Sequence, residues 1–266
     1  MMRTALVTGA SSGIGAACAA RLVAAGWRVF AGVRRAGDAP ARTEEILLDV
    51  TNEEHVQAAA ERIEELHGLV NNAGIALAMP LEFIPLDELR RQFEVNVVGQ
   101  VAVTQAFLPQ LRRTRGRIVF VGSIAGRSAL PFLGPYAASK HALEAIADTL
   151  RLELRPFGVD VSLVQPGTIR TPIWAKSATV ADALANGAPA ELAGLYGERM
   201  AAFREVAQKR GAKGASAENV ARVEEALTME RPRTRKLVGV DAKVRSGVER
   251  LPDRLRDRVY ERVLLR

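Results

Sequence analysis

Short apolar runs rich in β-branched residues alternate along this chain with stretches whose apolar positions recur every three or four residues. The short runs are typical of buried strands, and the longer periodic stretches are typical of amphipathic helices. The pattern predicts strands at Thr4–Thr8, Arg28–Val33, Glu45–Asp49, Leu69–Asn72, Arg117–Gly122, Val159–Gln165 and Lys236–Val240. It predicts helices at about Gly13–Ala25, Glu53–Leu66, Asp87–Arg113, Pro135–Pro156 and Ala217–Glu230.

Strands that alternate with helices indicate a parallel sheet covered by helices on both faces. We therefore expect an α/β fold, a Rossmann-type three-layer doubly wound parallel sheet of about seven strands in a single domain over residues 1–240. No Gly/Ser-rich or Pro-rich linker divides the chain. The predicted helix Asp87–Arg113 is long and contains Gly99, so it is compatible with two consecutive helices.

Two segments depart from this alternation. Residues 171–213 are rich in Ala and Gly with scattered large apolar side chains, which favours a substrate lid or pocket wall over a disordered loop. The spacing of apolar positions in residues 241–266 predicts a basic amphipathic C-terminal helix with an Arg-rich polar face. This helix is expected to pack on the body, form a subunit contact or rest on an anionic membrane surface, and the pattern leaves all three open. Its apolar positions are Val244, Val248, Leu251, Leu255, Val259 and Val263.

The net charge of the chain comes from its last part. Residues 1–230 contain 25 Lys and Arg against 25 Asp and Glu, whereas residues 231–266 contain 12 against 5, which accounts for the formal +7. Arg alternates with Asp and Glu in the tail, and aromatic residues are only 5% of the chain. A solvated helix face is therefore expected, and no nucleic-acid partner.

The location expected from the sequence is cytoplasmic. Cys18 is the single cysteine, so no intrachain disulfide is possible and a reducing compartment is favoured. We expect a buried structural thiol there. The first residues enter a predicted strand without a leader pattern, and no apolar stretch approaches the roughly 18 residues of a membrane span.

Tyr136 and Lys140 carry the first candidate chemistry. They are four residues apart on a predicted helix and so lie on one face of it. An ammonium close to a phenol favours the phenolate and lowers the pKa of the phenol. Ser123, at the end of a predicted strand, is suited to hold the oxygen of a carbonyl or an alcohol. These residues predict a proton-transfer site that needs a hydride carrier, although the spacing alone also fits a partly buried Tyr beside a solvated Lys.

A glycine-rich turn supplies a place for such a carrier. The segment Thr8–Gly15 follows the first predicted strand and opens the first predicted helix. Its glycines allow a tight turn and a close approach to a pyrophosphate, and the helix N-terminus offers N–H groups and the positive end of the helix dipole. The spacing is G-x-x-x-G-x-G rather than G-x-G-x-x-G. The residues expected to contact the cofactor here are Gly9, Ser11, Ser12, Gly13, Ile14 and Gly15.

The end of the second predicted strand indicates which cofactor is used. A carboxylate at this point would bind the ribose 2′-hydroxyl of NAD, but Val33 stands there and Arg34 follows. An Arg pairs with a 2′-phosphate through charge-assisted hydrogen bonds. NADP(H) is therefore favoured, and NAD(H) is the alternative if Arg34 and Arg35 are only solvated loop charges.

With these residues assembled, the chain resembles the short-chain dehydrogenase/reductase family over residues 1–240. The stretch from Val121 to Trp174 is most similar to the branch that contains 17β-hydroxysteroid and retinol dehydrogenases. The residues 1–240 would then be a dinucleotide-binding catalytic domain. The matched motifs are Thr8–Gly15, Asp49-Val50, Asn71-Asn72-Ala73-Gly74, Asn96, Ser123, Tyr136-x-x-x-Lys140 and Pro166-Gly167.

The resemblance implies a role for each matched residue. Tyr136 would be the general acid in carbonyl reduction and the base in alcohol oxidation. Lys140 would lower the pKa of Tyr136 and hold the nicotinamide ribose, and Ser123 would position the substrate oxygen. Asn96 would support a water that links Lys140 to solvent. No metal is implied. The further cofactor contacts implied are Asp49, Val50, Asn72, Ala73, Gly74, Tyr136, Lys140, Pro166, Gly167, Ile169 and Thr171.

The substrate and the partners are specified less closely. Ser123, Tyr136 and Trp174 are expected to contact the substrate, and the apolar segment after Thr171 favours a lipophilic steroid, retinoid, aldehyde or ketone. Trp174 and Phe203 fit either a pocket wall or lid packing. The family's habit of pairing through its long helices implies a homodimer or homotetramer. The alternative function is a non-catalytic NADP-binding regulatory protein with the same fold.

Overall fold

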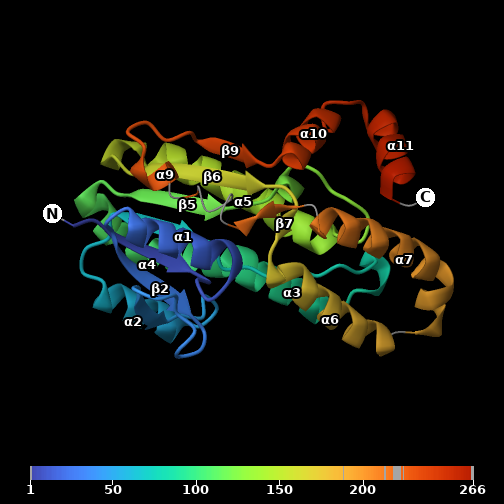
Figure 1. Ribbon diagram of the computed structural model, residues 1–266, viewed down its shortest axis with the longest axis horizontal. Coiled ribbons are helices and arrows are strands. Elements are labelled where there is room, and N and C mark those ends of the chain that lie inside the picture. Colours follow the sequence, from blue (N-terminus) through green and yellow to red (C-terminus); the bar gives the residue numbers. More distant parts are fainter. Residues whose placement is uncertain (1, 188, 213, 218–222, 224, 265–266) are drawn as a thin grey trace.

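Seven strands form one parallel sheet in the computed structural model, in the order β3-β2-β1-β4-β5-β6-β9 (Figure 1). The structure describes the whole chain except residues 1, 188, 213, 218–222, 224 and 265–266. All adjacent pairs in this sheet are parallel, and each predicted strand is confirmed to within two residues at either end. The strands are β1 (Thr4–Thr8), β2 (Arg28–Val33), β3 (Glu44–Leu47), β4 (Gly68–Asn71), β5 (Arg117–Val121), β6 (Asp160–Pro166) and β9 (Arg235–Val238).

Helices cover both faces of the sheet, as the alternating pattern predicts (Figure 1). One buried cluster joins one face of the sheet to α2, α4 and α5, and a second joins the other face to α1 and α9. The described helices are α1 (Gly13–Ala24), α2 (Glu53–Arg62), α3 (Leu86–Phe93), α4 (Gly99–Thr114), α5 (Gly134–Leu154), α6 (Pro172–Asn186), α7 (Ala190–Ala212), α9 (Glu225–Thr228), α10 (Val240–Val248) and α11 (Asp253–Leu264).

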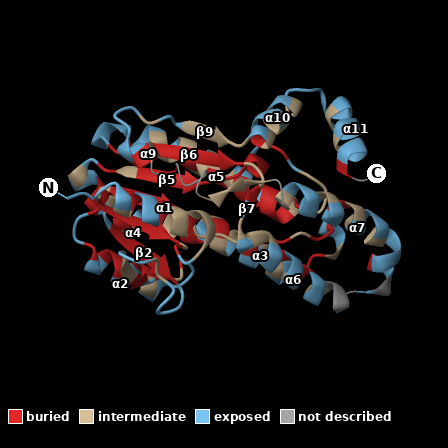
Figure 2. Ribbon diagram, viewed as in Figure 1, coloured by how far each residue is buried: buried red, intermediate tan, exposed pale blue. Residues whose placement is uncertain are grey.

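The central strands show why this sheet needs two helical layers. On β5, Ile118 and Phe120 belong to one cluster while Val119 and Val121 belong to the other. Side chains alternate across a strand, so a strand that is apolar at every position has to be buried on both faces. Figure 2 shows the result, a buried sheet between helices whose outer faces are exposed.

The predicted helix Asp87–Arg113 is interrupted, as Gly99 suggested. A π-helical turn, Glu94–Val98, separates α3 from α4. An added Cβ at Gly99 would lie 2.8 Å from the carbonyl oxygen of Val50, so α4 begins where it passes closest to the chain after β3. Single π-helical turns are often found at functional sites, and this one carries Asn96.

Residues 171–213 form two helices that the loose sequence pattern did not predict as such. α6 and α7 cover the carboxyl end of the sheet, and a small second sheet of β7 (Ile169–Arg170) and β8 (Ala215–Ser216) lies at their base. Phe203 packs edge-on against Phe132 at 5.5 Å between ring centroids, so it serves lid packing. Of the helix predicted at Ala217–Glu230, the described part contains α9, and residues 218–222 and 224 lie outside the described residues.

The prediction of one helix over residues 241–266 is wrong in its continuity, because the tail forms two helices, α10 and α11. The break falls at Pro252, which has no N–H for a helical hydrogen bond and instead accepts one from Leu255 at its carbonyl oxygen (2.9 Å). The predicted apolar face of the tail does not pack on the body. Ala242 and Leu264 are buried, whereas five of the six predicted apolar positions are exposed, namely Val244, Leu251, Leu255, Val259 and Val263.

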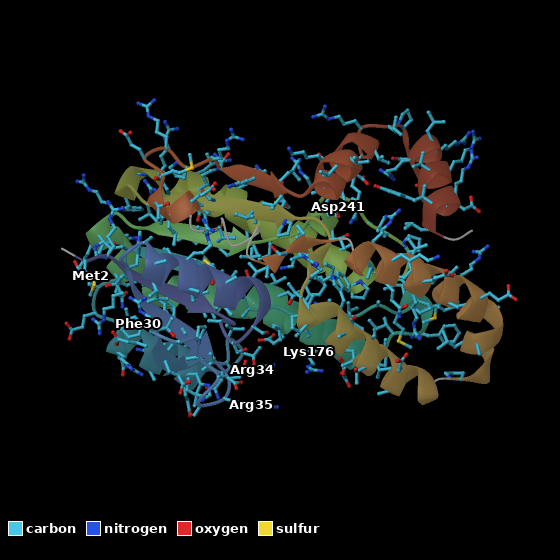
Figure 3. All side chains as sticks on the ribbon, in the orientation of Figure 1. Met2, Phe30, Arg34, Arg35, Lys176 and Asp241 are labelled. Carbon is cyan, nitrogen blue, oxygen red and sulfur yellow. The ribbon has the colours of Figure 1, made fainter. Side chains whose placement is uncertain are left out.

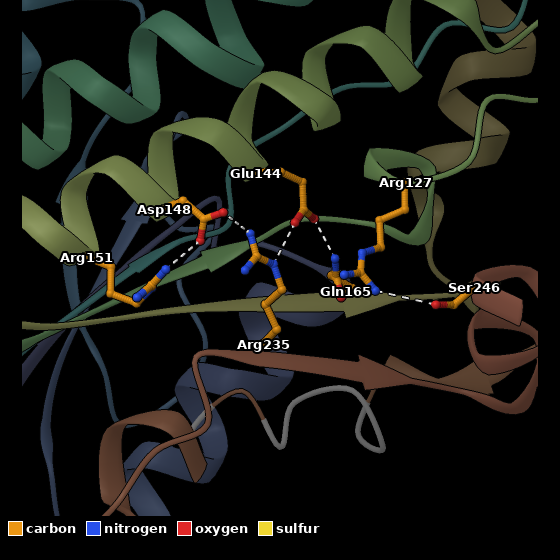
Figure 4. A network of polar contacts seen from close by, with 7 residues as sticks. All are labelled: Arg127, Glu144, Asp148, Arg151, Gln165, Arg235 and Ser246. Carbon is orange, nitrogen blue, oxygen red and sulfur yellow. Dashed lines mark hydrogen bonds and ion pairs between the residues drawn. The ribbon is translucent and has the colours of Figure 1, made fainter. Parts of the chain in front are cut away.

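A network of polar contacts ties the edge strand β9 to α5 (Figure 4). Arg235 of β9 donates to Glu144 at 3.0 Å and also pairs with Asp148, and Glu144 accepts from Gln165 of β6 at 2.6 Å. Hydrogen bonding to Arg235 holds the pKa of Asp148 below its ordinary value. β9 leads directly into α10, so this network also fixes where the tail begins.

None of the described helices is both long enough and apolar enough for a membrane crossing. The predicted oligomer and the predicted membrane contact of the tail stay predictions.

The two-layer core gives a stability prediction. Phe107 on α4 is fully buried, whereas Phe157 is 49% exposed. Phe107→Ala is expected to lower the free energy of unfolding by about 3–5 kcal/mol, because it removes buried surface and leaves a cavity. The matched control Phe157→Ala is expected to cost less than about 1 kcal/mol. Urea denaturation measures both, and equal losses would contradict this packing.

Candidate active site

The site begins at a joint between the ends of β1 and β4. The hydroxyl of Thr8 accepts hydrogen bonds from the backbone N–H groups of Asn72 and Ala73, both at 3.0 Å, and donates to the carbonyl oxygen of Val70 at 3.3 Å. The amide of Asn72 donates in turn to the carbonyl oxygens of Thr8 (2.9 Å) and Gly9 (3.1 Å). The strand order reverses between β1 and β4, which is where parallel α/β sheets open a crevice for ligands.

The glycines of the turn are required by this joint. Gly9 has φ +64°, and an added Cβ would lie 2.9 Å from the Cα of Ala73. A Cβ at Gly15 would lie 2.4 Å from the Asn72 amide nitrogen and from the carbonyl oxygen of Gly9. Larger residues at either position would separate the turn from β4. The turn therefore keeps its backbone open toward the crevice and α1 keeps its N-terminus there.

A cavity of about 750 Å³ extends from this crevice. That volume is within the range of cofactor and ligand sites in proteins. Of the residues predicted from the sequence, Gly15 and Asn96 do not line it, because Gly15 packs against Asn72 and Asn96 is fully buried behind the wall. The predicted residues that line it are Gly9, Ser11, Ser12, Gly13, Ile14, Arg34, Asp49, Val50, Asn72, Ala73, Gly74, Ser123, Tyr136, Lys140, Pro166, Gly167, Ile169, Thr171 and Trp174.

Arg34 and Asp49 lie at one end of the cavity. Figure 3 shows Arg34 and Arg35 together beyond the end of β2, and only Arg34 lines the cavity. Partial burial acts to raise the pKa of Asp49, but hydrogen bonds from the backbone and side chain of Thr51 and the charge of Arg34 outweigh it and hold that pKa low. The Asp49 carboxylate is therefore ionised and already oriented.

Tyr136 and Ser123 meet at the other end. Ser123 follows β5 and caps a short 3₁₀ turn by accepting from the N–H of Ala125 at 3.1 Å. It lines the cavity together with Tyr136, near the start of α5, and its hydroxyl acts to lower the pKa of Tyr136. Trp174 packs edge-on against Tyr136, with 5.6 Å between ring centroids. Trp174 is thus a wall of the cavity. The two hydroxyls form a pair that is suited to hold one substrate oxygen.

Lys140 lies one turn along α5, fully enclosed below Tyr136. Its Nζ donates to the carbonyl oxygen of Val121 at 2.9 Å and lies 5.8 Å from the centroid of the Tyr136 ring. Burial lowers the pKa of Lys140 to about 8, and no neighbouring carboxylate among the described residues opposes that shift. An ammonium that is buried with one carbonyl partner has donors left for the hydroxyls of a ribose.

The pKa of Tyr136 differs from the sequence-based expectation. Burial raises this pKa, while the hydrogen bond with Ser123 and the charge of Arg245 act to lower it and do not prevail. The expectation that Lys140 lowers the pKa of Tyr136 stays a prediction, because that lysine is itself desolvated and bound to Val121. A second cation, Arg245 from the tail, also acts on Tyr136.

Asn96 has a different set of contacts from the one expected. Its side chain accepts from the N–H of Ile75 at 2.8 Å and donates to the carbonyl oxygen of Ile75 at 2.9 Å and to the hydroxyl of Ser139 at 3.0 Å. It therefore ties the chain after β4 to α5 between Tyr136 and Lys140. The predicted water relay through Asn96 stays a prediction.

Sequence reasoning missed the residues that support the site from a distance. Ser139, Arg245 and Asp241 hold parts of it in place, and of these only Ser139 lies within a matched motif. Ser139 could have been found from its position within the Tyr136–Lys140 turn. Arg245 and Asp241 could not, because the sequence gives no sign that the tail folds back onto the site.

The residues present fit a nicotinamide dinucleotide. The cavity includes the N-terminus of α1, which is suited to a pyrophosphate. Arg34 lines one end of the cavity, and Lys140 and Tyr136 line the other. Lys140 is a buried donor that lacks a charged partner there. The segment Pro166–Thr171 forms the remaining wall, and Thr171 lies against the turn at Gly13.

Comparison with known proteins agrees with this geometry. The family model described as short chain dehydrogenase matches residues 3–181. NADPH-dependent 3-dehydrocapnine reductase of Ornithobacterium rhinotracheale is 37% identical, over 97% of this chain and 96% of that protein. Retinol dehydrogenase 16 of Homo sapiens is 37% identical over 90% and 81%, and 17-beta-hydroxysteroid dehydrogenase type 6 of Bos taurus is 37% identical over 89% and 80%.

A solved structure of a short chain dehydrogenase also has the same fold as this chain. The short chain dehydrogenase from Burkholderia cenocepacia J2315, in complex with NADP, superposes with a TM-score of 0.75 at 28% identity, over 99% of this chain and 100% of that one. The resemblance, the branch and the fold expected from the sequence are all confirmed.

The joint between β1 and β4 predicts how the turn tolerates substitution. Gly9→Ala is expected to weaken NADPH binding more than tenfold, because its Cβ would push the turn away from Ala73. Gly26→Ala is the matched control, since Gly26 also has positive φ (+81°) but nothing lies within 4 Å of its added Cβ. It is expected to cost about 1 kcal/mol of stability and to leave the Kd unchanged. Fluorescence titration with NADPH measures both Kd values, and equal weakening would contradict the role of the joint.

Proposed function

The chain belongs to the short-chain dehydrogenase/reductase family, and we propose that it is an NADP(H)-dependent oxidoreductase that interconverts a carbonyl and an alcohol on a lipophilic small molecule. The observation that carries this proposal is that Ser123, Tyr136 and the buried Lys140 line the same dinucleotide-sized cavity, with the Lys140 ammonium 5.8 Å from the centroid of the Tyr136 ring.

The two hydroxyls provide what a carbonyl reduction needs from a protein. The nicotinamide of bound NADPH supplies the hydride. Negative charge develops on the substrate oxygen as its carbon is reduced, and Ser123 and Tyr136 are placed to donate hydrogen bonds to that oxygen. Tyr136 then gives its proton to the oxygen. In alcohol oxidation Tyr136 takes the proton back as a base.

Lys140, one helical turn after Tyr136, supports both carbonyl reduction and alcohol oxidation. Its ammonium has donors for the ribose hydroxyls of the cofactor and is close enough to Tyr136 to favour a phenolate there. It is charged at neutral pH, because its pKa is lowered only to about 8. Above that pH the ammonium loses its proton, so the favourable charge beside Tyr136 declines.

NADP(H) is favoured over NAD(H) by the residues at the far end of the cavity. Val33 stands where a carboxylate would bind a 2′-hydroxyl, and Arg34 lines the cavity beside it. Arg34 is exposed, so its contribution to a 2′-phosphate contact is the ordinary one for a charge-assisted hydrogen bond, about 1.5–3 kcal/mol. Relatives described as NADPH-dependent or in complex with NADP support the same choice.

The walls next to Tyr136 support a lipophilic substrate. Trp174 and Ile173 from α6 stand beside Ala76 and Leu77, and Val180 continues the apolar surface. Apolar walls with a few polar groups at one end are typical of small-molecule sites. Relatives named for retinol and for a steroid accord with this substrate class.

The direct test of the proposed function removes one oxygen. Tyr136→Phe is expected to retain NADPH binding and to lose turnover by about 10²–10⁴-fold, because the proton donor is gone. Consumption of NADPH with steroids, retinoids, aldehydes and quinones measures turnover. Tyr196→Phe removes the same atom from a half-buried tyrosine that binds Glu82 and does not line the cavity, and it is expected to keep activity. Full activity in Tyr136→Phe would overturn the mechanism, and no turnover in the parent chain despite NADPH binding would favour the regulatory alternative.

The choice of cofactor is tested at the end of β2. Arg34→Ala is expected to reduce the preference for NADPH over NADH by about ten- to a hundredfold, since the 2′-phosphate loses its charged partner. Arg35→Ala is the control, because the adjacent Arg35 does not line the cavity. Paired Kd measurements with NADPH and NADH distinguish the two. Tighter binding of NADH than NADPH by the parent chain would show that Arg34 has another role.

A further inference from the structure

Helix α10 in the tail reaches the site from two sides. Asp241 and Arg245 are four residues apart and lie on one face of α10. Figure 3 shows Asp241 at the point where the chain passes from β9 into α10. The carboxylate contacts the chain after β6, and the guanidinium contacts the loop after Ser123. α10 therefore touches both segments that flank the reacting end of the cavity.

Asp241 fixes the chain after β6. Its carboxylate accepts a hydrogen bond from the backbone N–H of Thr168 at 2.5 Å. An added Cβ at Gly167 would lie 2.2 Å from the same carboxylate, so a side chain here would displace Asp241 from this position. Gly167 also donates to the carbonyl oxygen of Val238 at 2.9 Å. The wall at Pro166 and Gly167 thus depends on the start of α10.

Arg245 fixes the loop that begins at Ser123. Its guanidinium donates to the hydroxyl of Ser128 at 2.8 and 3.2 Å and to the carbonyl oxygen of Ser128 at 3.1 Å. Ser128 is fully buried, and its N–H donates to the carbonyl oxygen of Ile124, the residue after Ser123. The hydroxyl of Tyr260 from α11 lies 3.0 Å from that of Ser128 and donates to Glu249 at 2.5 Å. Both tail helices therefore hold this loop.

Arg245 also brings a positive charge close to Tyr136, because it binds Ser128 in the loop whose Ala125 packs with Tyr136. Burial lowers the pKa of Arg245, and the nearby Tyr260, Asp241 and Glu249 oppose that shift, so the group remains a cation. Its charge lowers the pKa of Tyr136. The other groups facing Tyr136 are the hydroxyl of Ser123 and the ammonium of Lys140.

We propose that Arg245 is a positioning residue of the reaction: it holds the loop that carries Ser123 in line with Tyr136 and stabilises the phenolate form of Tyr136 by its charge. This inference rests on the proposed function, because it assigns the source of part of the stabilisation that Tyr136 needs. A positive charge provided by a distant part of the chain would make the tail necessary for activity, although none of its described residues lines the cavity.

A titration tests this without a substrate. The chain has three tyrosines, Tyr136, Tyr196 and Tyr260, so the phenolate absorbance of a protein minus that of its Tyr136→Phe counterpart reports Tyr136 alone. With saturating NADP⁺, Arg245→Gln is expected to raise the pKa of Tyr136 by roughly one unit. Arg245→Lys keeps the charge and is expected to shift it by less. The change in Tyr260 cancels in each pair, because both members share the same substitution at Arg245.

The matched control is Arg127→Gln. Arg127 is an exposed arginine of the same loop that contacts Ser246 of α10 at 3.4 Å (Figure 4). This variant is expected to leave the pKa of Tyr136 unchanged. An unchanged pKa in Arg245→Gln, or an equal shift in Arg127→Gln, would overturn the proposal. If Arg245→Gln does not fold, as judged by circular dichroism, Arg245→Met takes its place, because it also removes the charge and is judged by the same two outcomes.

The pH dependence of kcat/KM for alcohol oxidation is a second test of the role of Arg245. Oxidation needs the phenolate, so kcat/KM rises with pH through the pKa of Tyr136, and Arg245→Gln should move that rise to higher pH. A purely structural role would lower kcat/KM at every pH without moving the profile. The two failures are distinguishable: an active Tyr136→Phe variant contradicts the proposed function, whereas an inactive Tyr136→Phe with an unmoved Arg245→Gln profile contradicts only the role of Arg245.

Discussion

The joint between the ends of β1 and β4 is the constraint on which the site depends. The hydroxyl of Thr8 accepts two backbone N–H groups from the chain after β4, and Asn72 donates back to the turn after β1. These bonds hold two connections that leave the sheet in opposite directions, at the point where the strand order reverses. Because these two connections diverge, a crevice opens between them. The N-terminus of α1 faces this crevice, and the cavity extends through it from Arg34 to Tyr136.

The sequence predicted the sheet well because a buried parallel sheet is specified by local composition. Each strand is a short β-branched run, and both faces are buried, so its signal does not depend on distant partners. The turn Thr8–Gly15 and the pair Tyr136 and Lys140 were found for the same reason, since their residues are close in sequence. The family resemblance then joined them to Ser123 and Asn96.

What the sequence did not predict depends on contacts between distant segments. Pro252 marks the break between α10 and α11, but its helical flanks follow one continuous apolar pattern. The charge of Arg245, which acts to lower the pKa of Tyr136, reaches it only when the tail folds onto the loop after Ser123. The same holds for the lid, where α6 supplies Trp174 to the cavity wall and α7 uses Phe203 for packing. The cavity wall next to Tyr136 therefore comes in part from the least regular part of the sequence.

The most direct test of the central claim follows the hydride. NADPH that carries deuterium at its transferable position is incubated with the protein and a panel of steroids, retinoids, aldehydes and quinones, and the products are analysed by mass spectrometry. The account predicts deuterium on the carbinol carbon of at least one alcohol product, and none with Tyr136→Phe. Tight NADPH binding with no deuterium transferred to any carbonyl would contradict it.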